Sequence, residues 1–587
     1  MSYWRMPFRI AWLDVPALKR IIVPFFSLNS LMPGTDRVLL AQGIVSSLTL
    51  VSAVCVFGPK LGPSALFGAM IAQWEADRPL RARLGCALLV GGIMTGTMAL
   101  GVLIAPYPFL TVPVVVAFIL LMTTGYYSFV LTRGPGPLQL FYAVAIGSYL
   151  GQFGSIGWQV TDITACAVAV AGVLAVVAMV FAPHGPEERA VAQAEQSVAV
   201  FVRGVNETMS ARVRSAERHT AYAAVNRGWL TLRAAGRGLW GRRQAHVDRM
   251  IAANRRLSLR IVQDAYPHVD PDDVGFSTPA LRGRPTWWWL VRANFHRDSV
   301  AWFTAGRVGL AGGIAGGLTQ VFGLGHPYWA ILSATLILHR WIGRLATTTR
   351  ALHRAVGTLL GLGLVAAVLS FHPDAWDIIA IVVICIIAQN FLVQRNYALG
   401  IVFVTPMALL SIEVAGQAGP LSRLMSDRLT ETVIGATVAI LVTWSTGLHR
   451  PRDMMRARFR RSLRAIRQVL GCLVRAEAAA PVGIHARVVL QYELLTTLAV
   501  LTQAAEDDPS LVSWHDVEVA LADLGYAALS ACWLRDARAL VSPQAALADL
   551  EALSERLCLT NDMPAALREL TRALGGVRAR LAMRPAS

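Results

Sequence analysis

Charged residues are scarce in this chain of 587 residues. Only 15% of them are Asp, Glu, Lys or Arg, whereas a typical soluble protein carries about a quarter. The hydrophobic share is 55%, and the mean hydropathy is +0.50. This composition argues against an ordinary soluble protein. It favours a membrane protein with several spans and additional soluble parts.

Lysine and cysteine are also scarce. Arginine supplies nearly all of the positive charge, because the only lysines are Lys19 and Lys60, and the net charge is +18. The seven cysteines form no C-x-x-C pair and show no metal-ligand spacing. We therefore expect no disulfide framework, no metal site and no cofactor. The cysteines are Cys55, Cys86, Cys166, Cys385, Cys472, Cys532 and Cys558.

Sequence motifs of enzymes are missing as well. The chain contains no G-x-S-x-G, no P-loop and no H-E-x-x-H. His268 with Asp273 and His372 with Asp377 match an H-x4-D spacing, which chance often produces. We therefore expect neither an enzyme nor an ATP-driven pump.

The apolar residues are gathered into two blocks of six runs. A membrane-spanning helix needs about 20 largely apolar residues. The first block has runs at about 38–57, 63–74, 84–105, 108–128, 138–151 and 161–182. The second has runs at about 301–322, 328–339, 355–371, 376–393, 397–412 and 430–447. The sequence thus predicts an all-α membrane protein with two six-helix blocks, each followed by a cytoplasmic helical domain.

Five segments follow from this pattern. Arginine is concentrated in the loops on one side of both blocks, so the positive-inside rule places both termini in the cytoplasm. The start of the chain lacks the features of a signal peptide. The predicted segments are an amphipathic N-terminal segment (1–36), transmembrane repeat 1 (37–183), a cytoplasmic helical insert (184–300), transmembrane repeat 2 (301–448) and a cytoplasmic C-terminal helical domain (449–587).

The two blocks share a short internal repeat. The stretch "RVLLAQGI" from Arg37 to Ile44 matches "RVGLAGGI" from Arg307 to Ile314 at six of eight positions, 270 residues later. An even number of spans gives both blocks the same orientation. We therefore predict parallel repeats related by an axis along the membrane normal.

Glycines and one arginine mark the first helix of the second block. Gly309, Gly313, Gly316 and Gly317 fall on one helical face with G-x-x-x-G spacing, which predicts close packing against another helix, and Gly43 holds the same place in the first block.

Arg37 and Arg307 are predicted to point away from that glycine face, at the cytoplasmic end of each first helix. Two interpretations remain open. The side chains either snorkel to lipid headgroups, or they line the inner mouth of a pathway and attract anions.

Two stretches carry a family resemblance. They are "GHPYWAILSATLILHRWIGRLATTTRALHRAVGTLLGLGL" and "DRLTETVIGATVAILVTW". They resemble the fusaric acid resistance and aromatic acid exporter family, in motif over about 303–447 and in layout over nearly the whole chain. The first block lacks the matching residues. The motifs are Tyr328-Trp329-Ala330, Arg354-x-x-Gly357-Thr358-x-x-Gly361 and Arg428-x-x-Glu431-Thr432-x-x-Gly435.

The resemblance implies a bacterial inner-membrane exporter of aromatic or other weak organic acids, such as fusaric acid or a hydroxybenzoate. We expect a secondary carrier that is driven by protons. It also implies a distant kinship with the plant aluminium-activated malate transporters. The partners it implies are the organic anion, membrane lipids and a periplasmic adaptor protein. A homo-oligomer is a further option.

The spacing of the second and third motifs points to anion binding. Arg354 and Thr358 share one helical face, as do Arg428 and Thr432. An arginine fork suits a carboxylate, a threonine hydroxyl can orient it, and the glycines would leave room for a flat ring. Two alternatives remain open. Arg354 is an orientation signal, or Arg428 only pairs with Glu431.

Aromatic and acidic residues complete the candidate set. Tyr328 and Trp329 either stack on a substrate ring or anchor the chain at the membrane interface. Glu431 is the first candidate for a proton-coupling carboxylate, and Asp162, at the matching place in the first block, is the second.

Two rival functions fit the same composition. One is a passive organic-anion channel. The other is a membrane-anchored scaffold whose arginine-rich cytoplasmic helices contact lipid. We expect no nucleic-acid partner, because solvated helix faces and lipid contact explain the mild arginine excess.

Overall fold

The computed structural model describes most of the chain, and it is helical almost throughout. The predicted N-terminal segment 1–36 lies largely outside the described residues. No β-strand occurs among the residues described, so the all-α prediction is confirmed. The described residues are 27–28, 35–74, 77–129, 136–180, 184–204, 209–236, 243–275, 284–296, 299–324, 326–339, 343–416, 420–446, 450–557 and 563–584.

The chain divides into two compact units, which are described separately here. The first, called the apolar unit, consists of residues 1–76, 83–181 and 301–447. The second, called the polar unit, consists of residues 77–82, 182–300 and 448–587.

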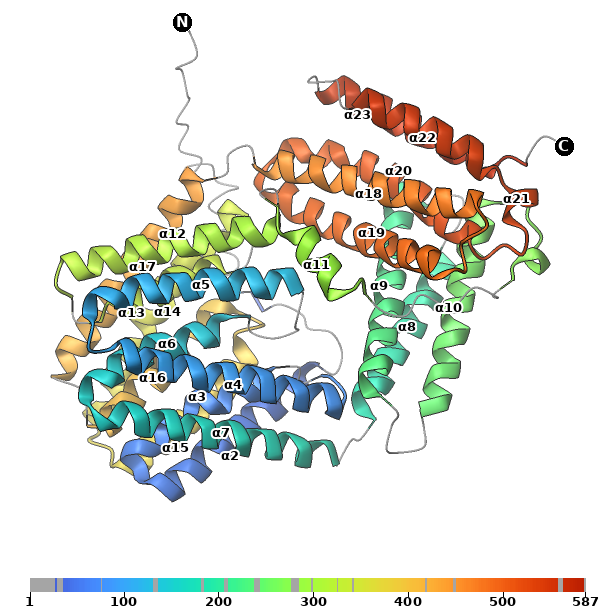
Figure 1. Ribbon diagram of the computed structural model, residues 1–587. Coiled ribbons are helices and arrows are strands. Elements are labelled where there is room, and N and C mark those ends of the chain that lie inside the picture. The colour runs from blue at the N-terminus through green and yellow to red at the C-terminus, as the bar shows by residue number, and fades with distance from the viewer. Residues whose placement is uncertain are drawn as a thin grey trace, which may run out of the picture. The chain divides into compact units, whose positions relative to one another are not determined.

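The helices of the apolar unit follow the predicted apolar runs (Figure 1). In the first block they are α2 (Thr35–Leu61), η1 (Gly62–Ala65), α3 (Leu66–Ala69), η2 (Met70–Gln73), α4 (Leu80–Ile104), α5 (Pro108–Phe129), α6 (Leu138–Leu150), η3 (Gly151–Phe153) and α7 (Ser155–Val180). In the second they are α12 (Val300–Val321), α13 (Pro327–Leu338), α14 (Arg344–Ser370), α15 (Ala375–Leu392), α16 (Tyr397–Val414) and α17 (Leu421–Ser445).

Eight helices within the described residues are long and apolar enough to cross a membrane. Four predicted runs are not among them. The helices α6 and α13 are too short, the six glycines and Arg307 lower the hydropathy of α12, and α17 carries several charges. The eight are Thr35–Gln73, Leu80–Ile104, Pro108–Ser128, Ser155–Val177, Arg344–Ser370, Ala375–Leu392, Tyr397–Val414 and, within the polar unit, Pro481–Ala505.

Glycines allow the helices of the apolar unit to approach closely. A Cβ atom on Gly435 of α17 would lie 2.5 Å from the carbonyl oxygen of Ala330 in α13. One on Gly357 of α14 would lie 2.7 Å from that of Ala398 in α16. The expectation that these glycines leave room for a substrate ring is therefore wrong, because neighbouring backbone fills the space.

The predicted glycine face on α12 is right in part. A Cβ atom on Gly309 would lie 2.5 Å from Leu120 of α5, and one on Gly316 would lie 2.7 Å from Ile331 of α13. A Cβ atom on Gly317, in contrast, would meet no heavy atom within 4 Å beyond its chain neighbours and its own helix backbone, among the described residues.

The polar unit is built from amphipathic helices. Three of its elements, α19, η5 and α22, begin at a proline, namely Pro481, Pro509 and Pro543. The elements are α8 (Gly185–Gly204), α9 (Ala211–Ala235), α10 (Arg243–Ala265), η4 (Pro271–Asp273), α11 (Trp287–Asn294), α18 (Arg450–Val474), α19 (Pro481–Asp507), η5 (Pro509–Ser513), α20 (Trp514–Ala531), α21 (Ala537–Leu540), α22 (Pro543–Leu557) and α23 (Met563–Ala582).

Helix α20 is the centre of this unit and packs against α9, α10, α18, α19 and α23. One acidic side chain of α20, Asp523, pairs with arginines from two neighbouring helices. Arg218 of α9 lies 2.7 Å from Asp523 of α20, and Arg578 of α23 lies 3.2 Å from the same carboxylate.

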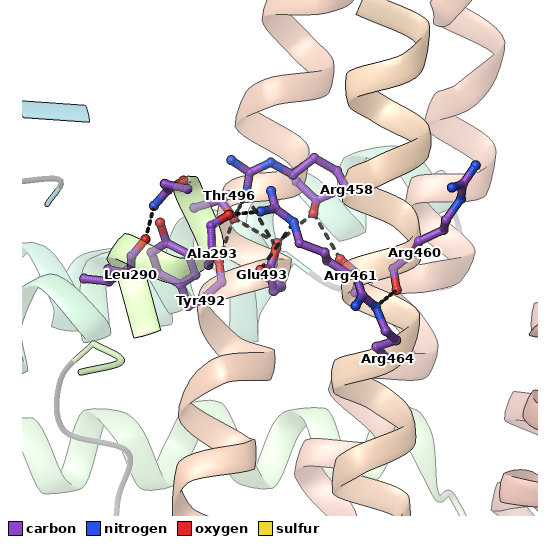
Figure 2. A network of polar contacts seen from close by, with 12 residues as sticks. Leu290, Ala293, Arg458, Arg460, Arg461, Arg464, Tyr492, Glu493 and Thr496 are labelled. Carbon is purple, nitrogen blue, oxygen red and sulfur yellow. Dashed lines mark hydrogen bonds and ion pairs between the residues drawn. The ribbon is translucent and has the colours of Figure 1, made fainter. Parts of the chain in front are cut away.

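A second buried ionic network joins α11, α18 and α19 (Figure 2). Glu493 lies 3.5 Å from Arg458 and 3.7 Å from Arg461, measured between nitrogen and oxygen. Arg461 also donates to the carbonyl oxygen of Ala293 at 2.6 Å, and Arg458 donates to Thr496 at 3.3 Å. One carboxylate thus holds two guanidinium groups inside the bundle.

One buried carboxyl group gives the polar unit a pH dependence. Burial raises the pKa of Glu518 on α20 to about 7, although the nearby charge of Arg218 acts in the opposite direction. The folded state therefore binds a proton that the unfolded state has lost, so stability falls as the pH rises from about 4.5 to about 7. We expect a loss of up to about 3 kcal/mol over this range.

The melting temperature of the purified chain at pH 5 and pH 8 measures this effect. Glu518→Gln is expected to raise the value at pH 8 and to shrink the difference between the two. Asp516→Asn, on the exposed first turn of the same helix, is the control and should leave the difference in place. An equal pH dependence in the Glu518→Gln protein would contradict the assignment.

Candidate anion-binding site

The second and third sequence motifs lie on neighbouring helices in the apolar unit. Helix α14 carries Arg354 and Thr358 on its buried face, and it packs against α17. Helix α17 carries Arg428 and Thr432 on its own buried face. Arg354 is 1% exposed and Arg428 is 2% exposed. Two arginines on neighbouring helices are therefore buried.

Arg354 is the more unusual of the two. None of its three guanidinium nitrogens has a hydrogen-bond partner among the described residues. The hydroxyl of Thr358, one turn further along, is likewise buried without a partner. An arginine that served only as an orientation signal would reach headgroups or water, so this buried position argues against that alternative.

Arg428 lies over an aromatic ring. Its guanidinium carbon is 4.9 Å from the ring centre of Trp329, at the start of α13. This is a cation–π contact, which weakly stabilises a desolvated charge. Arg428 is also close enough to Arg354 for the two positive charges to act on each other.

Glu431 does not form an ion pair with Arg428 in the part of the chain that the structure describes. One of its oxygens accepts a hydrogen bond of 3.0 Å from the backbone N–H of His326, and the other oxygen is buried without a partner. The ring of His326 lies 3.2 Å from a carboxylate oxygen of Asp427. The alternative in which Arg428 only neutralises Glu431 is therefore not what the structure contains.

Four aromatic rings from α6, α13 and the preceding loop pack together beside Arg428. The rings of His326 and Trp329 stack at 4.5 Å with an angle of 18°. Tyr149 of α6 lies 5.2 Å from His326 and 5.3 Å from Tyr328. Because Tyr328 and Trp329 are buried, Trp329 does not project outward as an interface anchor does.

Three further candidates stand apart from this group. Arg37 at the start of α2 is exposed, and so is Asp162 on α7. Arg307 of α12 is buried and donates a hydrogen bond of 2.7 Å to the hydroxyl of Thr443 on α17. The structure therefore brings together the motif residues of α13, α14 and α17, and it leaves Arg37 and Asp162 exposed.

Sequence reasoning missed several members of the group. Asp427 directly precedes Arg428, and an acidic residue next to the third motif was the available signal. Ser333 of α13 is buried with an unpartnered hydroxyl, and Tyr149 belongs to α6. Neither has a sequence signal, because only the packing of α6 and α17 against α13 brings them near.

The arrangement presents donors and positive charge in the buried part of the apolar unit. The guanidinium nitrogens of Arg354 are free to donate, and buried hydroxyls stand on α13, α14 and α17. No group of three or more metal-ligating side chains was found in the described residues. Such a set of donors suits an anion with oxygen acceptors, above all a carboxylate.

Comparison with known proteins covers this region of the chain. Residues 314–442 match the family described as fusaric acid resistance protein-like. The chain carries a fusaric acid resistance protein-like domain. This domain contains Arg354, Arg428, Glu431, Tyr328 and Trp329, whereas the first apolar block and the polar unit lie outside the match.

Similar proteins occur in bacteria. The uncharacterized membrane protein YvaC of Bacillus subtilis (strain 168) is 29% identical over 161 residues, which is 27% of this chain and 25% of that protein. The inner membrane protein YccS of Escherichia coli (strain K12) is 26% identical over 177 residues, 30% of this chain and 24% of that protein.

The aligned part thus spans about a quarter of the length of each relative. No solved structure matches the chain. Together with its apolar helices, the fusaric acid resistance protein-like domain identifies a multi-pass membrane protein.

Proposed function

We propose that this protein is an inner-membrane efflux transporter for aromatic or other weak organic acids, and that Arg354 and Arg428 hold the carboxylate of the substrate. The observation that carries the proposal is the state of Arg354, which is buried and has no hydrogen-bond partner at any nitrogen in the described residues.

A buried charge without a partner is costly. The penalty for removing an ion from water is several kcal/mol, and a second positive charge nearby increases it. Glu431 does not pair with either arginine in the described structure, and Asp427 contacts His326. A bound anion would offset this cost, and a carboxylate matches the planar guanidinium fork.

The aromatic cluster favours an acid with a ring. Trp329, Tyr328, His326 and Tyr149 lie beside Arg428, so an aromatic ring could stack there while its carboxylate contacts the arginine. Offset or edge-to-face contacts of this kind contribute about 0.5–1.5 kcal/mol beyond burial. Aromatic acids are therefore the preferred substrate class.

Matched helix contacts support a duplicated architecture. Helix α2 packs on α15, and its counterpart α12 meets α5 through Gly309. Within the blocks, α3 packs on α7 as α13 packs on α17. We infer two parallel six-helix repeats that exchange their first helices. Only the second repeat carries the arginine motifs, so the substrate site is asymmetric.

Several parts of the mechanism are proposals of the same kind. Glu431, with one unpartnered oxygen beside the aromatic cluster, is the preferred proton-coupling carboxylate, and the exposed Asp162 is the weaker candidate. We propose that the polar unit and both termini lie in the cytoplasm. A transporter rather than an enzyme is proposed, and kinship with the plant malate transporters and use of a periplasmic adaptor stay predictions.

Transport in proteoliposomes tests the proposal. We expect the full chain to move radiolabelled 4-hydroxybenzoate, and we expect Arg428→Gln and Arg354→Met each to lower the rate at least about tenfold, because each removes charge-assisted hydrogen bonds. Arg423→Gln is the matched control, since Arg423 lies on the same helix α17 but is exposed.

Stability separates a binding role from a structural one. Because Arg354 is a buried cation without a partner, Arg354→Met is expected to melt no lower than the wild type while losing transport. Equal transport by the wild type and both variants would contradict the proposal. A transport rate that still depends on the two arginines but does not change with the proton gradient would identify a passive channel instead of a proton-driven carrier.

A further inference from the structure

The polar unit contains a buried arginine that differs from its other buried arginines. Arg487 on α19 is 1% exposed. Its Nη1 atom donates a long hydrogen bond of 3.4 Å to the carbonyl oxygen of Ala478, and its Nε and Nη2 atoms have no partner among the described residues. These two nitrogens form one edge of the guanidinium group, the edge that binds a carboxylate with two parallel hydrogen bonds.

No carboxylate of the described residues compensates this charge. The titratable groups that act on Arg487 are Cys532 and Tyr222. One is a thiol and the other a phenol, so neither is a carboxylic acid. The other buried arginines of the unit are paired, as Arg218 is with Asp523 and Arg458 is with Glu493. An unpaired buried cation costs several kcal/mol, so the exception calls for a physical reason.

Further hydrogen-bond donors come from α9 and α20. The rings of Tyr222 and Tyr526 stack at 4.5 Å with an angle of 22°, and both hydroxyls are buried without a partner. Burial raises the pKa of both phenols, so the hydroxyls stay protonated and can donate. Tyr222 lies on α9 and Tyr526 on α20, and both helices pack against α19, which carries Arg487.

Acceptor atoms without partners lie one helical turn away. Gln491 follows Arg487 by four residues on α19, and Asn226 follows Tyr222 by four residues on α9. The Oε1 atom of Gln491 and the Oδ1 atom of Asn226 have no hydrogen-bond partner among the described residues. Residues at this spacing are neighbours on one helical face. Since α9, α19 and α20 pack against one another, unpartnered donors and acceptors from all three helices converge on one region of the bundle.

We propose that the polar unit binds a small organic carboxylate, held by the Nε–Nη2 edge of Arg487 and by the hydroxyls of Tyr222 and Tyr526. The unpartnered amide oxygen of Gln491 suits a ligand that also carries a hydroxyl group. This site involves none of the residues of the apolar unit and does not rest on the proposed transport function. It would let the protein respond to an organic acid separately from moving it.

Anion-dependent stability of the full chain in detergent tests this proposal. Benzoate and 4-hydroxybenzoate are expected to raise the melting temperature by roughly 3 °C or more at saturating concentration. In a protein that carries Arg354→Met and Arg428→Met, the remaining ligand-induced shift is expected to come from the Arg487 site. Adding Arg487→Met to that protein should abolish it. Without ligand, Arg487→Met should melt no lower than the wild type, because it removes an unpaired buried charge. Arg475→Met, at an exposed ion pair, is the control.

Binding of radiolabelled benzoate keeps the two sites distinguishable. Arg487→Met should lose one class of site and retain the class that depends on Arg428, with affinity at the former falling at least about tenfold. A shift or binding that is unchanged by Arg487→Met would overturn the proposal. Stabilisation by inorganic phosphate or chloride through Arg487, without any effect of the carboxylates, would overturn the assignment of the ligand class.

Discussion

Glu493→Gln is expected to destabilise the polar unit by about 3–5 kcal/mol. Glu493 is the only carboxylate seen within ion-pair distance of Arg458 and Arg461 in the described residues, at 3.5 and 3.7 Å. The substitution keeps the shape of the side chain but leaves two guanidinium groups in the bundle without a counter-charge. Removing one partner of a buried ion pair has a cost of this size, because the desolvation of the remaining charges is no longer offset.

Hydrogen exchange of the α18 and α19 amides in the full chain measures this loss locally, which a single melting curve of a two-unit protein does not. We expect protection to fall at least about a hundredfold. Glu551→Gln, which breaks an exposed pair of 3.1 Å with Arg467 on the same helix α18, should change protection by less than about threefold. Unchanged protection in Glu493→Gln would show that the network does not hold these helices together.

Gly435→Leu is expected to prevent correct packing of the apolar unit. Even a methyl group on Gly435 would lie 2.5 Å from the carbonyl oxygen of Ala330 and 3.0 Å from the backbone nitrogen of Ala334. Backbone atoms of a helix cannot move aside as a side chain can, so α13 and α17 must separate. We expect the free energy of unfolding to fall by at least about 3 kcal/mol. We also expect Trp329 to be displaced from Arg428.

The yield of monodisperse protein after detergent extraction, and its melting temperature, measure this effect. Gly363→Leu is the matched control, because a Cβ atom on Gly363 of α14 would meet no heavy atom within 4 Å beyond its chain neighbours and its own helix backbone in the described residues. Leucine favours a helix over glycine by roughly 0.8 kcal/mol, so the control should fold at least as well as the wild type. Equal yields of the two variants would rule out the close contact of α13 and α17.

Local sequence patterns were sufficient to predict most of the helices. Apolar runs of span length correspond to α2, α4 and α5, and the prolines at 481, 509 and 543 mark where elements begin in the polar unit. The run at 63–74 was predicted as one span but forms η1, α3 and η2. Gly58, whose φ is 78°, and Pro59 interrupt helix α2 just before this run.

The position of a glycine on a helical face does not predict what that glycine contacts. Spacing showed that Gly309, Gly316 and Gly317 lie near one face. It did not show that Gly317 faces open space, or that Gly357 and Gly435 meet carbonyl oxygens of other helices. A missing side chain permits either a ligand or a neighbouring backbone, and only the position of the neighbouring helix decides between them.

The sequence by itself determined an all-α membrane protein and the helical faces on which Arg354, Thr358, Arg428 and Thr432 stand, because hydropathy and helical periodicity are local properties. The tertiary structure alone decided that Arg354 is buried without a partner among the described residues, and that Glu431 accepts a hydrogen bond from His326 there rather than pairing with Arg428. It also decided that Asp162 is exposed. Burial and pairing depend on which helices pack together, and residues far apart in the chain set that packing.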